Sequence, residues 1–276
     1  MKNHTILFIL IFSIFTLISC TTHRYIYSAS PADSPYFTKK GQSELSGYYS
    51  VSGNVLPKGY AHGFDLHGAY AISDHWALTA GYFNRKEKDI DHNYNTPSDS
   101  SVVVVGYKRN LFGIGGGYFI PLNPRKTITF NLYGGMDFGK FSINENDQSN
   151  GISDERFHDS KITKWFIQPS INFMPGRYFH ASFISKNSFV HYGGITTSYT
   201  TDELAHYSLN KIANKTIHFS EPALDIQLGF PNIPWLKLDM MWSFATSNDY
   251  DETQLDIRSP NFSIGLSMDF SQMSKK

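Results

Sequence analysis

Ionisable side chains recur at every second position of several apolar segments, and their types limit the chemistry that the chain could perform. They lie opposite rows of Leu, Ile, Phe and Met, and they are Asp65, His67, Asp137, Glu221, Asp225, Lys237, Asp239 and Asp269. Such groups could line a path for an ion or a substrate, or they could pair with one another. Because an unpaired buried charge is unfavourable by several kcal/mol, we favour mutual pairing, which predicts a polar network in a narrow enclosed space.

A second set of ionisable residues has the composition of a hydrolytic site. Asp89, Asp91 and His92 follow one apolar segment, and His158 and Asp159 precede another. An Asp/His pair can activate a water molecule as a general base. The chain contains neither the GxSxG pattern of a serine nucleophile nor the HExxH pattern of a zinc site. We therefore expect no enzymatic activity, no metal site and no cofactor.

The elements that position these residues are β-strands. In residues 261–270, Phe262, Ile264, Leu266, Met268 and Phe270 alternate with polar residues and Gly, and period-two alternation predicts a half-buried strand. The same pattern predicts ten strands. They are about 43–52, 60–72, 75–88, 101–121, 125–143, 160–174, 177–192, 214–230, 234–247 and 258–270.

The connections between the strands alternate in length. Short turns lie at 73–74, 122–124, 175–176 and 231–233, and longer polar loops lie around 53–59, 89–100, 144–159, 193–213 and 248–257. This rhythm, with strands longer than a soluble sandwich needs, predicts an all-β fold, a transmembrane antiparallel up-and-down β-barrel of about ten strands. Counts of eight or twelve stay open. The length of the strand at 125–143 predicts that part of the barrel projects past the membrane on the long-loop side.

The end of the chain resembles the terminal β-signal of bacterial outer-membrane barrels, through Ser263, Gly265, Met268 and Phe270. The resemblance implies that the barrel-insertion machinery reads this strand and that it closes the barrel against the first strand, near residues 45–51. Outer-membrane lipids are then the surroundings. The formal net charge is zero, so no nucleic-acid partner is expected.

The start of the chain resembles the leader of a bacterial lipoprotein. Residues 1–19 hold Lys2 and an apolar run that ends Leu17, Ile18, Ser19, and the only cysteine, Cys20, follows. This lipobox-like pattern implies acylation of Cys20. Residues 34–42 resemble the entry segment of Bacteroidota-type outer-membrane barrel lipoproteins, which include small porin-like barrels.

The expected organisation is a signal peptide (1–19), a lipid-anchored periplasmic linker (20–42), the barrel (43–270) and a polar tail (271–276), with both termini periplasmic. A structural or surface-binding role through the long loops is the function that we favour, with an envelope or surface partner for those loops. Narrow porin-like passage of small solutes is the alternative. A third interpretation is an outer-membrane protease, because the rim residues resemble those of the omptins.

Overall fold

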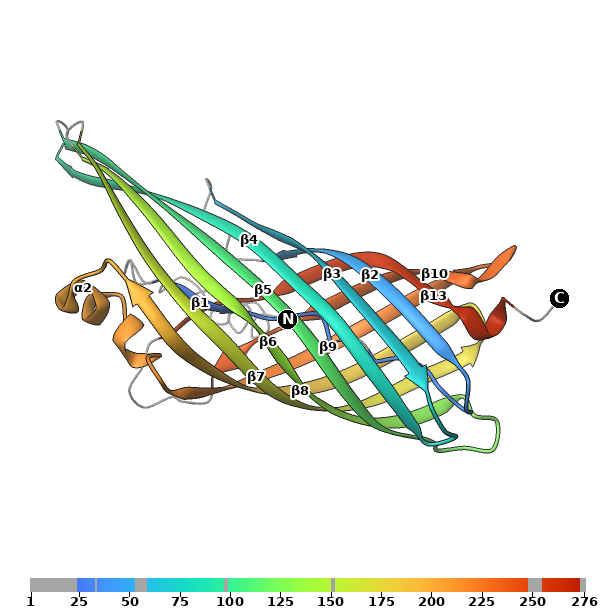
Figure 1. The fold of residues 1–276 in the computed structure, drawn as a ribbon. Helices are drawn as coiled ribbons and strands as arrows, with labels where there is room; N and C mark the ends of the chain where they lie inside the picture. Colours follow the sequence, from blue (N-terminus) through green and yellow to red (C-terminus); the bar gives the residue numbers. More distant parts are fainter. Residues whose placement is uncertain are drawn as a thin grey trace, which may run out of the picture.

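The computed structural model describes residues 24–32, 34–52, 59–96, 99–149, 152–247 and 255–273. Ten long antiparallel strands form one closed sheet, as expected (Figure 1). They are β2 (Ser43–Ser52), β3 (Tyr60–Ala71), β4 (Trp76–Thr96), β5 (Asp99–Pro121), β6 (Ile128–Ser149), β7 (Ile152–Gly176), β8 (Phe179–Thr197), β9 (Thr216–Phe230), β10 (Ile233–Ser243) and β13 (Asn261–Asp269).

Closure occurs where the sequence predicts it. The last strand β13 pairs with the first barrel strand β2, from Asn261 opposite Ser52 to Asp269 opposite Glu44. The other edge of β13 pairs with β10, so every strand has two neighbours. Closure leaves no row of unpaired backbone groups facing a lipid phase, where such groups would be strongly unfavourable. The final strand ends one residue earlier than expected, because Phe270 begins a short 3-10 turn, η2 (Phe270–Gln272).

The remaining elements are short. Strand β1 (Tyr25–Ser28) pairs in parallel with β12 (Asp256–Arg258), and β11 (Thr246–Ser247) extends the pairing of β9. The helix α2 (Thr201–His206) and the 3-10 turn η1 (Leu209–Lys211) lie in the connection between β8 and β9. No helix in the described part of the chain is long and apolar enough to cross a membrane.

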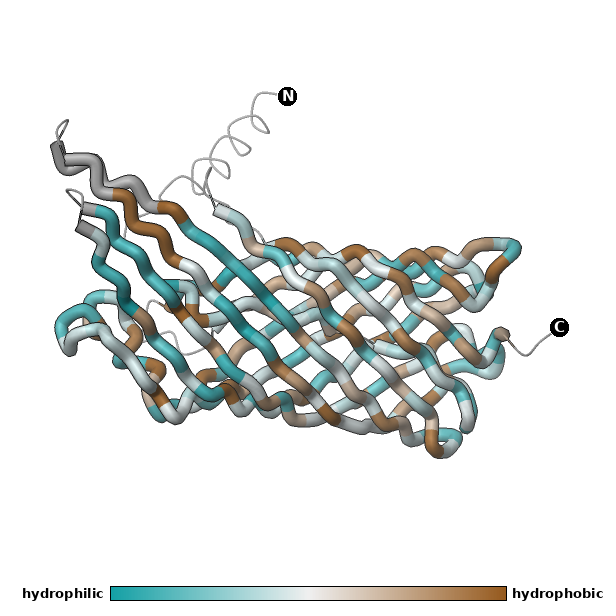
Figure 2. The backbone as a smooth tube through the Cα atoms, turned by 45° about the horizontal axis from the view of Figure 1, so that its top comes forward, coloured by the Kyte–Doolittle hydropathy of each residue, from teal (hydrophilic) through white to brown (hydrophobic). Residues whose placement is uncertain are grey.

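The outer surface carries an apolar band of exposed Leu, Ile, Phe, Tyr and Trp side chains. Figure 2 shows hydrophobic residues, in brown, along the strands of the barrel. On β6, the outward positions from Ile128 to Phe138 are apolar, apart from Gly134, and the next outward residue is the exposed Lys140. Ten residue steps on a strand tilted by about 40° span about 26 Å, which matches the ~25 Å lipid-facing band of transmembrane barrels. Exposed aromatic and aliphatic side chains of this density indicate a barrel that spans a membrane.

The upper boundary of this band is a row of polar residues that crosses four neighbouring strands. Asn84, Asn110, Lys140 and Lys161 lie directly opposite one another on β4, β5, β6 and β7. Beyond this polar row, β6 continues for nine residue steps to Ser149, or roughly 23 Å of height. The predicted loops at 89–100 and 144–159 are therefore wrong for the described residues, which extend the strands. Backbone ladder bonds continue there, and on β6 the alternation is reversed, with Phe141 and Ile143 buried and Ser142 and Asn144 on the outer face.

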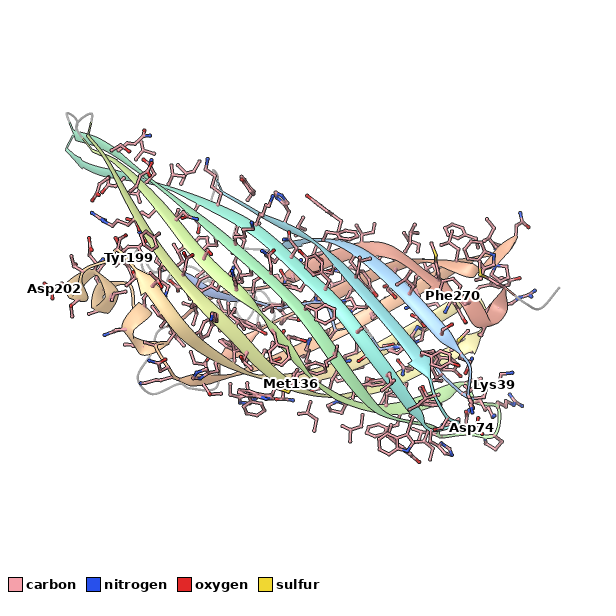
Figure 3. The ribbon with its side chains drawn as sticks, viewed as in Figure 1. Lys39, Asp74, Met136, Tyr199, Asp202 and Phe270 are labelled. Carbon is pink, nitrogen blue, oxygen red and sulfur yellow. The ribbon has the colours of Figure 1, made fainter. Side chains whose placement is uncertain are left out.

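The two ends of the barrel differ. Figure 3 labels Lys39, Asp74 and Phe270 at the end with the short turns, and Tyr199 and Asp202 at the end with the long connections. In outer-membrane barrels, short turns face the periplasm and long connections face outward. We call these the inner end and the outer end. The expected loops at 53–59 and 248–257 fall largely outside the described residues.

The greatest difference from the sequence expectation concerns residues 24–37. They are expected to form a periplasmic linker, and instead they lie inside the barrel, with nearly all of their described side chains buried. We call residues 24–37 the lumen segment. Its residues Tyr27, Ala32 and Phe37 each join a different cluster of buried apolar residues, so the core of the protein is built around the segment.

Candidate functional site

The interior of the barrel, with the lumen segment in it, is the site where the sequence-predicted polar residues converge. The segment is held along its whole length by side chains of the barrel wall. Its contacts change in chemical type from the outer end to the inner end.

At the outer end, the segment is fixed by an ion-pair cluster around Glu145. The Arg24 guanidinium donates to the Glu145 carboxylate at 2.8 Å, and the Tyr199 hydroxyl donates to the same carboxylate at 2.6 Å. Arg156 lies 3.2 Å from the other oxygen of Glu145 and 3.2 Å from Glu203 of α2. Both oxygens of the buried Glu145 carboxylate have partners. Its negative charge is balanced by Arg24 of the segment and Arg156 of the wall.

A second cluster joins the lumen segment to β4 and β5 of the wall and to β12, the partner of β1. Glu87 of β4 pairs with Arg109 of β5 and with Arg258 of β12, both at 2.6 Å. Arg109 also donates to the carbonyl oxygen of Tyr25, and the Arg258 guanidinium lies 3.9 Å from the centre of the Tyr25 ring. Cation–π contact and hydrogen bonding therefore hold Tyr25 from both sides.

In the middle of the barrel, the buried Glu221 is the centre of a third cluster. Tyr27 donates to Glu221 at 2.8 Å, and its ring stacks on Phe219 with the ring centroids 3.8 Å apart. Lys164 donates to the Tyr27 hydroxyl at 3.0 Å and lies 3.5 Å from Glu221. Lys164 also lies 3.7 Å from Asp137, and Lys164 and Lys186 both donate to Ser30 of the segment.

Toward the inner end, the contacts are neutral. The hydroxyl groups of Ser34 and Ser170 are 2.6 Å apart, and Ser34 donates to Asn172 at 3.0 Å. The Asn131 amide donates to the carbonyl oxygen of Pro35 at 3.0 Å. Phe37 packs edge-to-face on Phe119 with the ring centroids 5.8 Å apart. Hydroxyl, amide and aromatic contacts thus replace the ion pairs of the outer half.

Other polar residues pair within the wall itself. Asp65 accepts hydrogen bonds from Arg85 at 2.8 Å and from Ser50 at 2.7 Å, and all three side chains are buried. Asp239 accepts from Tyr48 at 2.8 Å and from Gln227 at 3.0 Å. Each pairing joins neighbouring or next-neighbouring strands and satisfies groups that would otherwise be buried without partners.

A cavity of about 70 Å³ remains between the lumen segment and one side of the wall. It is lined in part by Ser30, Pro35, His67, Asp137 and Lys186. The Nε2 atom of His67 is buried without a hydrogen-bond partner in the described part of the chain. A space of this size has room for a few water molecules, and His67, Asp137 and Lys186 are polar groups on its lining.

The structure brings most of the sequence-predicted polar residues into the interior. Those that are fully or almost fully buried are Asp65, Glu221, Asp225, Lys237 and Asp239. His67 and Asp137 line the cavity. Asp269 is different, because it lies at the inner end, where it accepts hydrogen bonds from Ser271 and Gln272 and caps η2.

The residues of the assembly signal are distributed over β13 and its end. Ser263 is buried and lies 2.7 Å from the hydroxyl of Ser50, and Met268 pairs with Leu45 of β2. Gly265 permits close pairing, because a Cβ atom there would collide with the carbonyl oxygen of Gly47. Phe270 is exposed at the first position of η2. Cys20, the predicted lipidation site, lies outside the described residues.

The structure does not bring together the described rim residues that have the composition of a hydrolytic site. His158 is buried facing the interior, whereas the next residue, Asp159, is exposed on the opposite face of β7. The Asp89 carboxylate is held by Arg258. The side chains of Asp91 and His92 lie outside those described. Among the described residues, no group of three His, Cys, Asp or Glu side chains could hold a metal ion.

The helix α2 lies at the outer end (Figure 3), and residues next to one another in the sequence form a capping box at its amino terminus. Thr200 accepts a hydrogen bond from the backbone N–H of Glu203, and the Glu203 carboxylate accepts from the backbone N–H of Thr200 at 2.8 Å. This backbone hydrogen bond lowers the pKa of Glu203, and the Thr200 hydroxyl and Arg156 lower it further. Glu203 is therefore ionised at neutral pH, and it joins the helix to the ion-pair cluster around Glu145 through Arg156.

Sequence reasoning missed the lumen segment and several charged residues of the barrel interior. Arg85 and Glu87 continue the inward alternation of the strand predicted at 75–88, so strict extension of that pattern would have found them. Arg24, Tyr25 and Tyr27 lie in a segment without periodicity, and their partners are far away in the sequence, 121 residues away for Arg24 and Glu145.

No family model and no curated protein matches the chain. Several solved structures are similar. The attachment invasion locus protein Ail of Yersinia pestis, in complex with a heparin analogue, has a TM-score of 0.34 and 14% identity, covering 84% of this chain and 99% of that one. The NanC porin has a TM-score of 0.39 and 9% identity, covering 82% and 98%. The outer-membrane protease OmpT of Escherichia coli has a TM-score of 0.39 and 11% identity, covering 83% and 94%.

Proposed function

We propose that this chain is an outer-membrane β-barrel lipoprotein whose lumen is closed by its own amino-terminal segment. In this proposal it conducts poorly, cleaves nothing, and acts as a structural or surface-binding protein through its outer end. The barrel-insertion machinery and outer-membrane lipids are its assembly partners.

The occupied lumen is the observation that carries the proposal. The lumen segment runs along the interior from the inner end to the outer end, and the wall binds it at Arg24, Tyr27 and Ser34. A ten-stranded barrel has a narrow interior even when nothing but its own side chains fills it. An additional stretch of chain with buried ion pairs leaves little space for a solute.

The outer end supports the binding role. Strands β4, β5, β6 and β7 rise well beyond the polar row that marks the edge of the apolar band, and α2 lies beside them (Figure 1). A rigid, membrane-distant platform of paired strands presents side chains in fixed positions, and binding surfaces built on such elements need less ordering than mobile loops.

Narrow passage of small solutes is the second candidate, and the cavity beside His67 and Lys186 favours it. A protease is less well supported, because His158 and Asp159 face opposite sides of β7. General-base catalysis needs both groups within reach of one water molecule.

Planar-bilayer recording of two proteins tests the proposal: the full chain, and a variant that lacks residues 24–37. We expect no steady single-channel current from the full chain and a clear current from the deletion variant, because the deletion empties the lumen. Folding of the variant is checked by its heat-dependent mobility in detergent gels. Large steady currents from the full chain would favour the solute channel instead.

The lipid is tested separately by intact-mass spectrometry of the membrane-extracted protein. A mature chain that begins at Cys20 and carries the mass of an acylated cysteine is expected. An unmodified Cys20 would remove the lipoprotein part of the proposal and leave the closed barrel.

A further inference from the structure

We propose that the amino-terminal end of the mature chain leaves the barrel at the outer end, opposite the carboxyl end, so that acyl chains on Cys20 insert into the outer leaflet from the cell surface. This inference rests on the proposed outer-membrane lipoprotein. It replaces the expectation that both termini face the periplasm.

The lumen segment begins its passage at the inner end. The backbone N–H of Lys40 donates to Asp74 in the turn between β3 and β4 at 2.8 Å, and the N–H of Gly41 donates to the carbonyl oxygen of Ala71 at 2.8 Å. The carboxyl end lies at this same end of the barrel, where η2 follows β13 (Figures 1 and 3).

The other end of the segment lies beyond the apolar band. Arg24 binds Glu145, and Glu145 lies five residue steps above Lys140 of the polar row on β6. Five steps on a strand tilted by about 40° correspond to about 13 Å of height. The Arg24 guanidinium also lies 4.0 Å from the centre of the Tyr207 ring, in the connection that follows α2. Arg24 is thus fixed to the outer end by two different elements.

The length of the segment agrees with a full passage. Asn131 binds Pro35, and Glu145 binds Arg24, so the two contacts are separated by 14 residue steps on β6 and by 11 steps on the segment. The tilted strand rises about 36 Å over this distance, and 11 extended residues span about 36 Å. The lumen segment is therefore extended along the barrel axis, and it does not fold back toward the periplasm.

The order of the contacts excludes the opposite direction. Phe37 and Ser34 meet wall residues toward the inner end, Tyr27 meets them in the middle and Arg24 at the outer end, and β1 runs parallel to β12, which descends from the outer end into β13.

This geometry limits where a lipid on Cys20 can insert. The four residue steps from Cys20 to Arg24 span at most about 14 Å. Arg24 lies about 13 Å above the outer edge of the apolar band, and the inner edge is about 25 Å further away. The periplasmic leaflet is therefore beyond the reach of Cys20, and the outer leaflet is the one on its side of the barrel.

Labelling of single introduced cysteines on intact cells tests the inference, because an acylated Cys20 does not react and the chain has no other cysteine. Three variants of the full chain each carry one introduced cysteine. Thr22→Cys tests the amino-terminal end, Asp202→Cys on α2 is the surface control, and Met273→Cys beyond η2 is the periplasmic control. With a membrane-impermeant maleimide, we expect Thr22→Cys to label in intact cells as fully as Asp202→Cys. Met273→Cys should label only after the outer membrane is permeabilised.

The outcomes separate this inference from the proposed function. If Asp202→Cys labels in intact cells and Thr22→Cys requires permeabilisation, the threaded topology is wrong and the outer-membrane barrel stands. If Met273→Cys labels and Asp202→Cys does not, the orientation itself is reversed and both proposals fail.

A protease recognition site inserted between Thr22 and His23 tests the position of the lipid directly. Protease added to intact cells should remove the acylated peptide, and the intact mass of the barrel should fall by that peptide. A barrel that keeps its full mass on intact cells, but is cleaved after permeabilisation, would contradict surface insertion. The unmodified full chain is the control.

Discussion

The two halves of the lumen segment are held by different forces. Residues 24–30 contact Glu145, Arg109, Glu221 and Lys164, so most of their anchoring groups are charged and buried. Residues 31–37 contact serine, asparagine and phenylalanine side chains. The same stretch of chain therefore passes from an ionic to a neutral environment over a few residues.

The difference has a physical consequence for the strength and specificity of the fit. Removing one partner from a buried ion pair leaves an uncompensated charge, whereas removing a neutral hydrogen bond leaves a smaller unsatisfied dipole. The outer half should therefore fix the depth and register of the segment, and the inner half should chiefly fill space. Four substitutions or changes of condition test this difference, in order of decreasing effect.

The largest effect is expected from Glu221→Gln, because Glu221 binds Tyr27 in the outer half of the lumen segment. Lys164 would lose a carboxylate at 3.5 Å while remaining buried, and Tyr27 would lose its charged acceptor. The free energy of unfolding should fall by about 3–5 kcal/mol, the usual effect of breaking a buried pair. Denaturant titration from lipid vesicles measures it. A loss in the free energy of unfolding smaller than that of Ser34→Ala, the variant of the neutral half, would contradict the difference between the halves.

Arg24→Met should have an intermediate effect. The substitution removes a guanidinium from Glu145, but the carboxylate keeps Arg156 at 3.2 Å and Tyr199 at 2.6 Å. A loss of about 1.5–3 kcal/mol is expected, as for hydrogen bonds to charged groups. Amide hydrogen exchange should show faster opening of β1 than of the barrel strands. Uniform exchange would mean that Arg24 does not fix the end of the segment.

Ser34→Ala in the inner half should cost about 1 kcal/mol, the net contribution of a neutral hydrogen bond. Ser170 and Asn172 lose one partner, but Asn172 retains contacts with Ser182 and Thr129. The same titration applies, with wild-type protein measured in parallel. A loss as large as that of Glu221→Gln would show that the two halves are energetically alike.

The smallest effect is a pH dependence of the cap on α2. The pKa of Glu203 is lower in the folded state than its unfolded value of about 4.3. The ionised carboxylate therefore stabilises the fold fully above the unfolded pKa, and this stabilisation is lost as the pH falls through the folded pKa. Amide exchange of α2 should accelerate below about pH 4. Glu203→Gln, which keeps the cap geometry but cannot titrate, is the control. An equal response of this variant would assign the change to another group.

The sequence by itself determined the strands, their faces and the closure of the barrel. Period-two alternation depends only on neighbouring residues, so it places Thr129 and Asn131 inside and Leu132 and Phe138 outside, where the folded barrel has them. The pairing of β13 with β2 follows from the same logic, because a lipid-exposed edge is excluded.

The polar extensions of β4 to β7 show where this logic ends. Above the polar row at Lys140, Phe141 and Ile143 point into the barrel and the outward residues of β6 are polar, the reverse of the pattern in the lipid-facing band. The strands persist there because backbone hydrogen bonds between neighbouring strands continue regardless of side-chain pattern.

Only the tertiary structure decided what the inward charges pair with and what fills the lumen. Tyr27 meets Glu221 across 194 residues and Arg258 meets Glu87 across 171, so no local pattern announces either contact. Residues 24–37 have no periodicity because they face wall side chains on every side, as a central chain inside a cylinder must. The closed barrel creates that environment, and it exists only after all ten strands have paired.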